Sequence, residues 1–393
     1  MMKDVRTWVE IDQSALRHNA EQFFTLIGPD THLMAVIKSN AYGHGLVQVA
    51  EQLAELGSRK HELGRHAHSS KFLIPNSRLW FGVDSIVEAL RLRREGITHP
   101  ILVLGHTLPS RIGEAAAKNI TLTVSNPDAL AALAGHKKRP AFHLKIDTGM
   151  HRQGFLPSET KKLISVLKRT KLTPEGIYTH FASAKDPRDP QYTKMQITLF
   201  GDVVSACERA GFRGMWRHAA ATGGTILFPE SRFDMVRVGM GLYGYWPSAE
   251  VQNAKRKAHI SLKPVMSWHT VVGEIKEIPS GSHIGYDETE IVRRRTKIAV
   301  LPIGYWHGYD RGLSGIGEVL IKGKRSKVLG RISMDMIVAD ITGIAGVKTG
   351  DEAVLIGRQK KEAIRADALA SRIGTTAYEL LTRINPLIRR VIV

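Results

Sequence analysis

His32-Leu-Met-Ala-Val-Ile-Lys38 is a short, largely apolar run that ends in a lysine. Its length and composition predict a buried β-strand. Similar runs recur up to residue 245, and they are residues 78–83, 100–104, 120–124, 141–146, 176–181, 215–219 and 235–238. The first part of the chain is therefore predicted to contain eight strands.

Between these runs, apolar residues recur at spacings of three and four, which is typical of amphipathic helices. The clearest helical stretches are residues 46–56, 86–95, 158–169 and 191–210. Repeated strand–helix units predict a parallel sheet. Eight units at this length favour an α/β fold of the closed (β/α)8, TIM-like barrel type. A doubly wound open sheet is the competing architecture.

The pattern changes after Tyr245. Residues 247–263 are polar and basic and are expected to form a linker, and a mostly-β region with glycine-rich turns follows from Val265. We therefore expect a barrel domain over residues 1–245 and a C-terminal mostly-β domain over residues 246–393. The expected strands of the second domain are residues 271–278, 297–301, 318–321, 336–341 and 352–356, before a helical segment at 364–372.

Charge and composition limit the class of protein. The 56 Lys and Arg residues outnumber the 37 Asp and Glu residues, for a formal net charge of +19. Nucleic-acid binding is one explanation, but the basic clusters are dispersed and lack interleaved aromatic residues, so a solvated basic surface is favoured. No apolar stretch approaches the roughly 18 residues of a membrane helix. With a polar N-terminus and the single Cys207, we expect a cytoplasmic protein.

One connection is longer than the barrel pattern requires. The segment between Gly57 and Trp80 contains His61, His66 and His68, which could be metal ligands. Apart from Glu62, no cysteine or paired acidic residue accompanies them, so a solvated loop is favoured and no metal site is predicted.

Barrel active sites gather at the carboxyl ends of the strands. Lys38 ends the first predicted strand there, and it either binds a carboxylate or forms a Schiff base with an aldehyde. Thr222-Gly-Gly224 and Gly239-Met-Gly241 follow the seventh and eighth strands, where barrels commonly bind phosphate. Tight turns are the alternative explanation for these glycines. Other polar residues expected at the same end are Lys145, Asp147, His180, His218 and Arg237.

Ala35-Val-Ile-Lys-Ser-Asn-Ala-Tyr-Gly-His-Gly45 closely resembles the cofactor-lysine signature of the alanine racemases. The resemblance extends along nearly the whole chain. The further matching stretches are residues 143–150 with Arg152, 178–181, 233–239 with 242–244, 301–305 and 330–335. It implies a barrel that binds pyridoxal 5'-phosphate (PLP), a C-terminal β domain and a homodimer with active sites at the subunit interface.

The resemblance also implies the chemistry. PLP acidifies the Cα–H of an amino acid, and inverting that centre requires bases on both faces of the cofactor. Lys38 matches the lysine that holds PLP and is one base. Tyr286 matches the other base, which enters from the partner subunit. His180 matches a contact of that tyrosine. Arg237 matches an arginine that faces the pyridine nitrogen, although a salt bridge at the strand end is its plainer explanation.

The remaining assignments come from the same resemblance. Positions that match the phosphate-binding residues are Tyr42, Thr222, Gly239, Met240 and Tyr378. Substrate contacts are implied for Arg152, Met334 and Tyr305, and Lys145 matches a lysine that is often carbamylated and orients the arginine. The implied activity is interconversion of L-alanine and D-alanine, which supplies D-alanine for peptidoglycan.

Several positions depart from the family pattern. Asp287 stands where glycine is common, Trp306-His307 where Ala-Asp is usual, and Ala221 where asparagine is common; the Ser58–Ser77 insertion is atypical. Alternative functions are a broad-specificity amino-acid racemase or a decarboxylase on the same scaffold. A PLP-binding protein without turnover is a third, but its single-domain relatives lack the domain that carries Tyr286.

Overall fold

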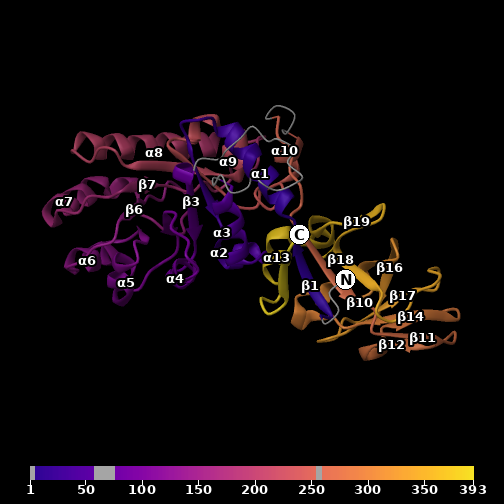
Figure 1. Ribbon diagram of the computed structural model, residues 1–393. Helices are drawn as coiled ribbons and strands as arrows, with labels where there is room; N and C mark the ends of the chain where they lie inside the picture. The colour runs from indigo at the N-terminus through magenta and orange to yellow at the C-terminus, as the bar shows by residue number, and fades with distance from the viewer. Residues whose placement is uncertain (1–4, 57–75, 254–258) are drawn as a thin grey trace. The chain divides into compact units, whose positions relative to one another are not determined.

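The computed structural model describes residues 5–56, 76–253 and 259–393 (Figure 1). They divide into two compact units. The barrel unit takes its described residues from Ser14–Ala41 and Val49–Lys263, and the sheet unit takes them from Met1–Gln13, Tyr42–Gln48 and Pro264–Val393.

The barrel unit is built on eight parallel strands that close on themselves in chain order. They are β2 (His32–Val36), β3 (Leu79–Val83), β4 (Ile101–Val103), β5 (Thr121–Val124), β6 (Phe142–Lys145), β7 (Gly176–Tyr178), β8 (Trp216–Ala221) and β9 (Met235–Val238). Seven of the eight predicted runs contain one of these strands, and the run at residues 215–219 overlaps β8. The prediction of a closed (β/α)8 barrel is therefore confirmed.

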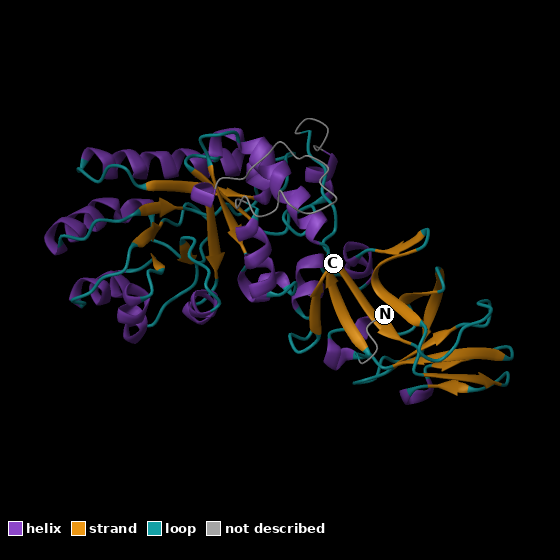
Figure 2. Ribbon diagram, in the orientation of Figure 1, coloured by secondary structure: helices purple, strands orange, loops and turns teal. Residues whose placement is uncertain are grey.

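Helices lie outside the barrel strands (Figure 2). The helices of residues 13–253 are α1 (Gln13–Ile27), α2 (Lys38–Tyr42), α3 (Leu46–Glu55), α4 (Ile86–Arg94), α5 (Ile112–Ala117), α6 (Pro127–Gly135), α7 (Thr160–Thr170), α8 (Gln191–Arg209), α9 (Thr222–Leu227) and α10 (Ala249–Asn253). Local sequence sets where they begin. Ser85 caps α4 by accepting the Glu88 N–H, and Asn126 caps α6 by accepting the Ala129 N–H.

The barrel interior has an apolar part and a polar part. Met34, Trp80, Leu102 and Met235 form a buried apolar cluster. The Trp80 ring lies 5.7 Å from that of His143, measured between centroids. His143 belongs to a neighbouring set of buried polar and aromatic residues, completed by Lys145, Tyr178, His218 and Arg237. The polar set therefore lies inside the fold, where each of its groups needs a partner.

The sheet unit contains a largely antiparallel sheet in the order β11-β14-β17-β16-β15-β18-β10-β1-β20, and β19 pairs with β18. Its strands are β1 (Thr7–Ile11), β10 (Met266–Val271), β11 (Glu274–Ile278), β14 (Thr296–Leu301), β15 (Glu318–Ile321), β16 (Lys324–Leu329), β17 (Ile337–Asp340), β18 (Glu352–Gln359), β19 (Glu362–Ile364) and β20 (Arg389–Ile392). Two helices accompany them, α12 (Ala366–Arg372) and α13 (Ala377–Thr382). The expected mostly-β second domain is therefore present.

The two units do not divide the chain at residue 245. β1 pairs with β10 and β20, so the N-terminal strand belongs to the sheet, as its indigo colour among orange and yellow strands shows in Figure 1. Residues 42–48 also join this unit, and Arg390 donates to the Gly43 carbonyl there. At the other boundary, Asn19 on α1 exchanges hydrogen bonds with the Lys263 backbone, which holds residues up to 263 in the barrel unit.

Other sequence expectations need correction. The expected linker at residues 247–263 contains the short helix α10, whose Val251 is buried. The first barrel strand ends at Val36 rather than Lys38, and Lys38 already begins the next element, α2. The segment with His61, His66 and His68 lies outside the described residues.

A small hairpin in the sheet unit carries Tyr286. Its strands are β12 (His283–Ile284) and β13 (Glu290–Ile291). Ile284 packs in a buried cluster with Val292, Ile298 and Leu329, and this cluster fixes the hairpin to the larger sheet. The loop of the hairpin therefore has a rigid base.

Among the helices of the described ranges, none has both the length and the apolar character that crossing a bilayer requires.

Candidate active site

Lys38 is held at the carboxyl end of the barrel with its amine accessible. Its Nζ lies 3.4 Å from Oδ1 of Asp84, and the side chain is 37% exposed. Asp84 directly follows β3, and Glu88 on α4 accepts both the Asp84 N–H and the Asn40 N–H. Glu88 therefore links the segment after β3 to the segment after Lys38. The exposure of the Lys38 side chain leaves its amine open to a ligand.

A left-handed turn follows Lys38. Ser39, Asn40, Ala41 and Tyr42 all have φ angles between 51° and 56°. Such a conformation costs non-glycine residues roughly 1–2 kcal/mol each. The buried Ala41 donates its N–H to the Ile37 carbonyl at 2.8 Å, which helps to hold the turn. Backbone strain of this kind concentrates at functional sites, which makes the Lys38 segment a candidate site.

Arg237 lies on β9 and is only 3% exposed. Its guanidinium donates to Nδ1 of His218 at 2.8 Å and to the carbonyls of Thr179 and Ala219 at 2.6 and 2.8 Å. Burial lowers the pKa of Arg237 to about 10, so it remains a cation at neutral pH. Within the described ranges, no carboxylate forms an ion pair with it, so the strand-end salt bridge considered from the sequence is not seen.

The hydrogen bonds of Arg237 set the tautomers of two buried histidines. Because the guanidinium can only donate, Nδ1 of His218 must accept, and its proton sits on Nε2. That Nε2–H points at Nδ1 of His143, 2.8 Å away. The proton of His143 is then on Nε2, which lies 3.4 Å from the Glu175 carboxylate. A polar chain therefore runs from Arg237 through His218 and His143 to Glu175.

The histidines around Arg237 are uncharged. Burial, followed by the charge of Arg237, lowers the pKa of His180 and of His218 well below the usual value. Burial also lowers the pKa of His143. Nδ1 of His180 lies 3.3 Å from Arg237 Nη2 and must accept as well, so its Nε2 carries the proton. His180 therefore presents one N–H to a further partner.

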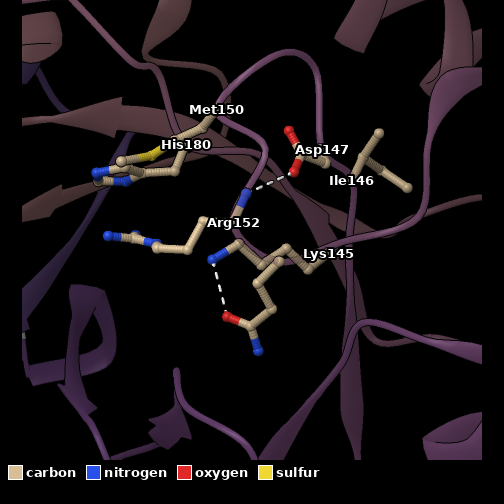
Figure 3. Close-up of a pocket in the computed structure, with 7 residues that line it drawn as sticks. Lys145, Ile146, Asp147, Met150, Arg152 and His180 are labelled. Carbon is tan, nitrogen blue, oxygen red and sulfur yellow. Dashed lines mark hydrogen bonds between the residues drawn. The ribbon is translucent and has the colours of Figure 1, made fainter.

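Lys145 lies in a small hollow with Met150, Arg152 and His180 (Figure 3). Its amine donates to Oε1 of Gln153 at 3.2 Å. Burial, with the nearby charges of Arg237 and Arg152, lowers the pKa of Lys145 to about 7. Much of this amine is consequently unprotonated near neutrality, which makes it a nucleophile.

Asp147 shapes the loop that carries Arg152. Its carboxylate accepts the N–H groups of Gly149, His151 and Arg152 at 2.9–3.0 Å. Burial favours the neutral acid, but the backbone N–H groups outweigh it and lower the pKa of Asp147. An ionised Asp147 thus fixes the loop that bears Arg152.

The segments after β8 and β9 lie close together. The Gly239 N–H donates to Oγ1 of Thr222 at 3.3 Å, and a Cβ on Gly241 would meet Phe23 at 2.5 Å. Ala221 precedes α9 and supplies no side-chain cap. The first N–H groups of a helix have no partner within it. Together with the Thr222 hydroxyl, they are a donor set that suits a phosphate, so these residues fit a phosphorylated cofactor.

The remaining predicted residues lie in the sheet unit. The rings of Tyr42 and Tyr378 meet edge to face, with centroids 6.1 Å apart, and burial raises the pKa of Tyr378 to about 12. Tyr286 is 69% exposed on its hairpin. Tyr305 and Met334 are also exposed, and the Tyr305 N–H donates to the Ser333 carbonyl at 3.1 Å.

The structure thus groups the predicted residues in two sets. The barrel set is Lys38, Lys145, Arg152, His180, Thr222, Arg237, Gly239 and Met240, and the sheet set is Tyr42, Tyr286, Tyr305, Met334 and Tyr378. The sequence interpretation assigned no role to His143, Tyr178 or Thr179, and none to His218 beyond its strand end. The available signal was a histidine within each of two strands, β6 and β8.

Comparison with family models divides the chain at a similar place. A model described as "Alanine racemase, N-terminal domain" matches residues 11–61 and 69–247. A model described as "Alanine racemase, C-terminal domain" matches residues 265–392.

Individual proteins match over the full length. An alanine racemase of Leptospira interrogans is 36% identical over 100% of this chain and 97% of its own length, and one of Desulforamulus reducens is 38% identical over 98% of each. A solved alanine racemase of Clostridium difficile 630 has a TM-score of 0.86 at 32% identity, covering 99% of this chain and 96% of that one. The Bacillus anthracis enzyme with bound L-Ala-P has a TM-score of 0.87 at 33% identity, covering 99% and 95%.

Proposed function

Because the chain belongs to the alanine racemase family, we propose that it interconverts L-alanine and D-alanine with Lys38 and the partner subunit's Tyr286 as its two bases. The family depends on PLP. Bound PLP withdraws electrons from the attached amino acid and so acidifies its Cα–H. The single observation that carries the proposal is the accessible amine of Lys38 at the same barrel end as a buried, purely donating Arg237.

The residues that would hold PLP follow from their chemistry. The Lys38 amine would bind its aldehyde carbon, and Arg237 would face its ring nitrogen. Thr222, Gly239 and Met240 of the barrel, with Tyr42 and Tyr378, are our proposed phosphate contacts. A guanidinium cannot accept a proton from the ring nitrogen, so Arg237 would limit long-lived carbanions and side reactions such as transamination.

The second base must reach the opposite face of the substrate. A phenol acts as a base only when nearby groups favour its phenolate. The Nε2–H of His180 can donate to that oxygen, and the positive charge of Arg237 lies behind His180. We therefore propose that His180 and Arg237 assist the partner subunit's Tyr286 in accepting and returning the proton.

A homodimer supplies this arrangement. Tyr286, Tyr305, Trp306 and Met334 are all exposed in the single chain, although they are large and apolar or aromatic. Exposed groups of this kind are typical of interaction surfaces. We propose that this tyrosine–methionine surface, formed by these four residues, completes the active site of a second copy. Arg152, the Met334 N–H and Tyr305 would bind the alanine carboxylate and limit the side chain to a methyl group.

Lys145 is proposed to carry a carbamate. Its neutral amine would attack CO2, forming an N–C bond and releasing one proton, and the product is an anion. That anion would lie among the cations of Arg152, Arg237 and Lys38, all of which act electrostatically on Lys145. Its attraction for Arg152 would orient the guanidinium toward the substrate carboxylate.

The cellular role proposed is supply of D-alanine for peptidoglycan in the cytoplasm, as the family resemblance implies. The alternative functions are tested by the same assay.

The decisive assay incubates the holoenzyme with L-alanine and measures both enantiomers by chiral chromatography. We expect equal amounts of L- and D-alanine at equilibrium. Release of CO2 would instead indicate a decarboxylase, and equally rapid inversion of other L-amino acids a broad-specificity racemase. Lys38→Ala should abolish racemisation and the visible absorption of bound cofactor.

A further inference from the structure

In the turn that carries Tyr305, every backbone N–H of residues 303–309 donates a hydrogen bond. Tyr305 and Trp306 donate to the carbonyls of Ser333 and Met334, at 3.1 and 3.0 Å. The N–H groups of residues 303 and 307–309 donate to carbonyls within residues 301–305. The Gly304 N–H donates instead to a side chain, Nδ1 of His307, at 3.2 Å.

Gly304 has no freedom to find another partner. A Cβ built on it would lie 2.2 Å from the Ser333 carbonyl oxygen and 2.3 Å from that of Met334. The backbones of the two segments are therefore in direct contact, and the Gly304 N–H is buried. A buried N–H that loses its acceptor bears the full cost of desolvation.

His307 is therefore the N3 residue of a short 3-10 turn, Tyr305–His307, whose N-cap is Gly304. In a capping box, the N3 side chain accepts the N-cap N–H, and glutamate or glutamine usually does so. Here an imidazole serves, which can accept through Nδ1 only while that nitrogen carries no proton.

On this basis, and resting on the proposed racemase function, we propose that neutral His307 is the positioning residue of the Tyr305 turn, and that protonation of His307 releases the turn. A proton on Nδ1 would place two N–H donors against each other. The Trp306 N–H donates a hydrogen bond to the Met334 carbonyl. Displacement of the turn would therefore reach both proposed substrate contacts, Tyr305 and Met334.

The surroundings favour the neutral form. His307 is 7% exposed, and burial lowers its pKa. Two charged groups face it from neighbouring segments: Asp335, whose Oδ1 lies 4.0 Å from Nδ1 and opposes the effect, and Arg6, which adds to it. The third neighbouring segment contributes Asn385, an uncharged residue whose N–H donates to the His307 carbonyl. An aspartate at this position would accept the hydrogen bond without this dependence on pH over the neutral range.

Two variants distinguish the role of residue 307 as a hydrogen-bond acceptor from the effect of protonating its side chain. His307→Gln keeps an acceptor at N3 and cannot titrate, whereas His307→Leu has similar bulk and no acceptor. His136→Gln, at a half-buried histidine after α6 in the barrel unit, is the matched control.

The test measures kcat and KM of the holoenzyme for L-alanine from pH 8.5 to pH 5.5. In the wild-type enzyme and in His136→Gln, we expect KM to rise more than kcat falls as the pH decreases. In His307→Gln, we expect the acid-dependent rise in KM to shrink at least threefold. His307→Leu, if it folds, should have a high KM at every pH. An unchanged profile in His307→Gln would overturn the proposal.

Hydrogen exchange of the Gly304 amide gives an independent readout. After correction for the intrinsic effect of pH, protection should fall on acidification in the wild-type protein and persist in His307→Gln. Equal protection in both proteins at both pH values would also overturn the proposal. Because this measurement does not depend on turnover, an enzyme that fails to racemise alanine at any pH would refute the proposed function alone.

Discussion

The Asp287 carboxylate lies 2.9 Å from Nε of Arg331. Asp287 directly follows Tyr286, and its φ angle is +59°. A negative charge beside the proposed base would oppose formation of its phenolate. The ion pair reduces this effect, because Arg331 offsets the charge of Asp287.

The two single replacements in this pair have different expected effects on kcat. Asp287→Asn tolerates the left-handed conformation and leaves Arg331 unpaired, so kcat should not fall. Arg331→Gln leaves the carboxylate unpaired and should lower kcat, by less than about fivefold because the pair is partly exposed. The double variant should return close to wild type. Steady-state kinetics of the four enzymes test this, and a decrease in Asp287→Asn equal to that in Arg331→Gln would contradict it.

Replacing His143 should destabilise the barrel. His143→Leu leaves the Nε2–H of His218 buried without its acceptor, at an expected cost of about 1–3 kcal/mol. The midpoint of urea unfolding should fall accordingly, and kcat should fall because His218 no longer holds Arg237 in place. His136→Leu, outside the polar chain, serves as control. Equal unfolding midpoints for the two variants would argue against the chain from Arg237 to Glu175.

The sequence was sufficient to predict the barrel strands, but it was insufficient to predict where the two units begin and end along the chain. Strand–helix alternation is a local pattern, so all eight strands were located from it. β1 pairs with β10, more than 250 residues along the chain, and no local pattern reveals such a partner. The left-handed turn after Lys38 was also missed, because Ser39 and Ala41 have no special preference for positive φ.

The residues of the site were predicted largely through the family resemblance, but the hydrogen bonds between them were not. Lys38, His180 and Arg237 were identified by motif. The tautomers of His143 and His218 depend on which atoms meet inside the barrel, and spacing along the chain does not contain that information. The compensation of Asp287 by Arg331 is likewise a contact between separate segments.

Stability should fall on mild acidification. His143 and His218 are fully buried, and burial lowers the pKa of each below the ordinary value of 6.5. Unfolding then takes up protons below that pH, so stability present above pH 6.5 is lost as the pH decreases toward the folded-state values. Two such groups lower the free energy of unfolding by up to about 3 kcal/mol for each pH unit of acidification. Urea unfolding at pH 7.5, 6.5 and 5.5 measures the effect, and an unfolding midpoint independent of pH would contradict it.

The proposed carbamate on Lys145 is directly observable. Protein equilibrated with 13C-bicarbonate should show a carbamate carbon resonance that is absent in Lys145→Arg. The resonance should disappear below pH 7, because protonation of the amine, whose pKa is about 7, removes the nucleophile. Lys145→Ala should raise KM for alanine on the order of tenfold, since a misplaced catalytic contact commonly costs that much or more. A wild-type spectrum without the resonance would remove this proposal.

In the proposed mechanism, Lys38 and the partner subunit's Tyr286 serve opposite faces of one substrate. The most direct test is Tyr286→Phe in deuterated water, with separate measurement of inversion and of α-hydrogen exchange. We expect inversion to fall by at least about 10²-fold, the lower range for loss of general acid–base catalysis. One enantiomer should still exchange its α-hydrogen with retention, through Lys38. Inversion at the wild-type rate in Tyr286→Phe would contradict the two-base account.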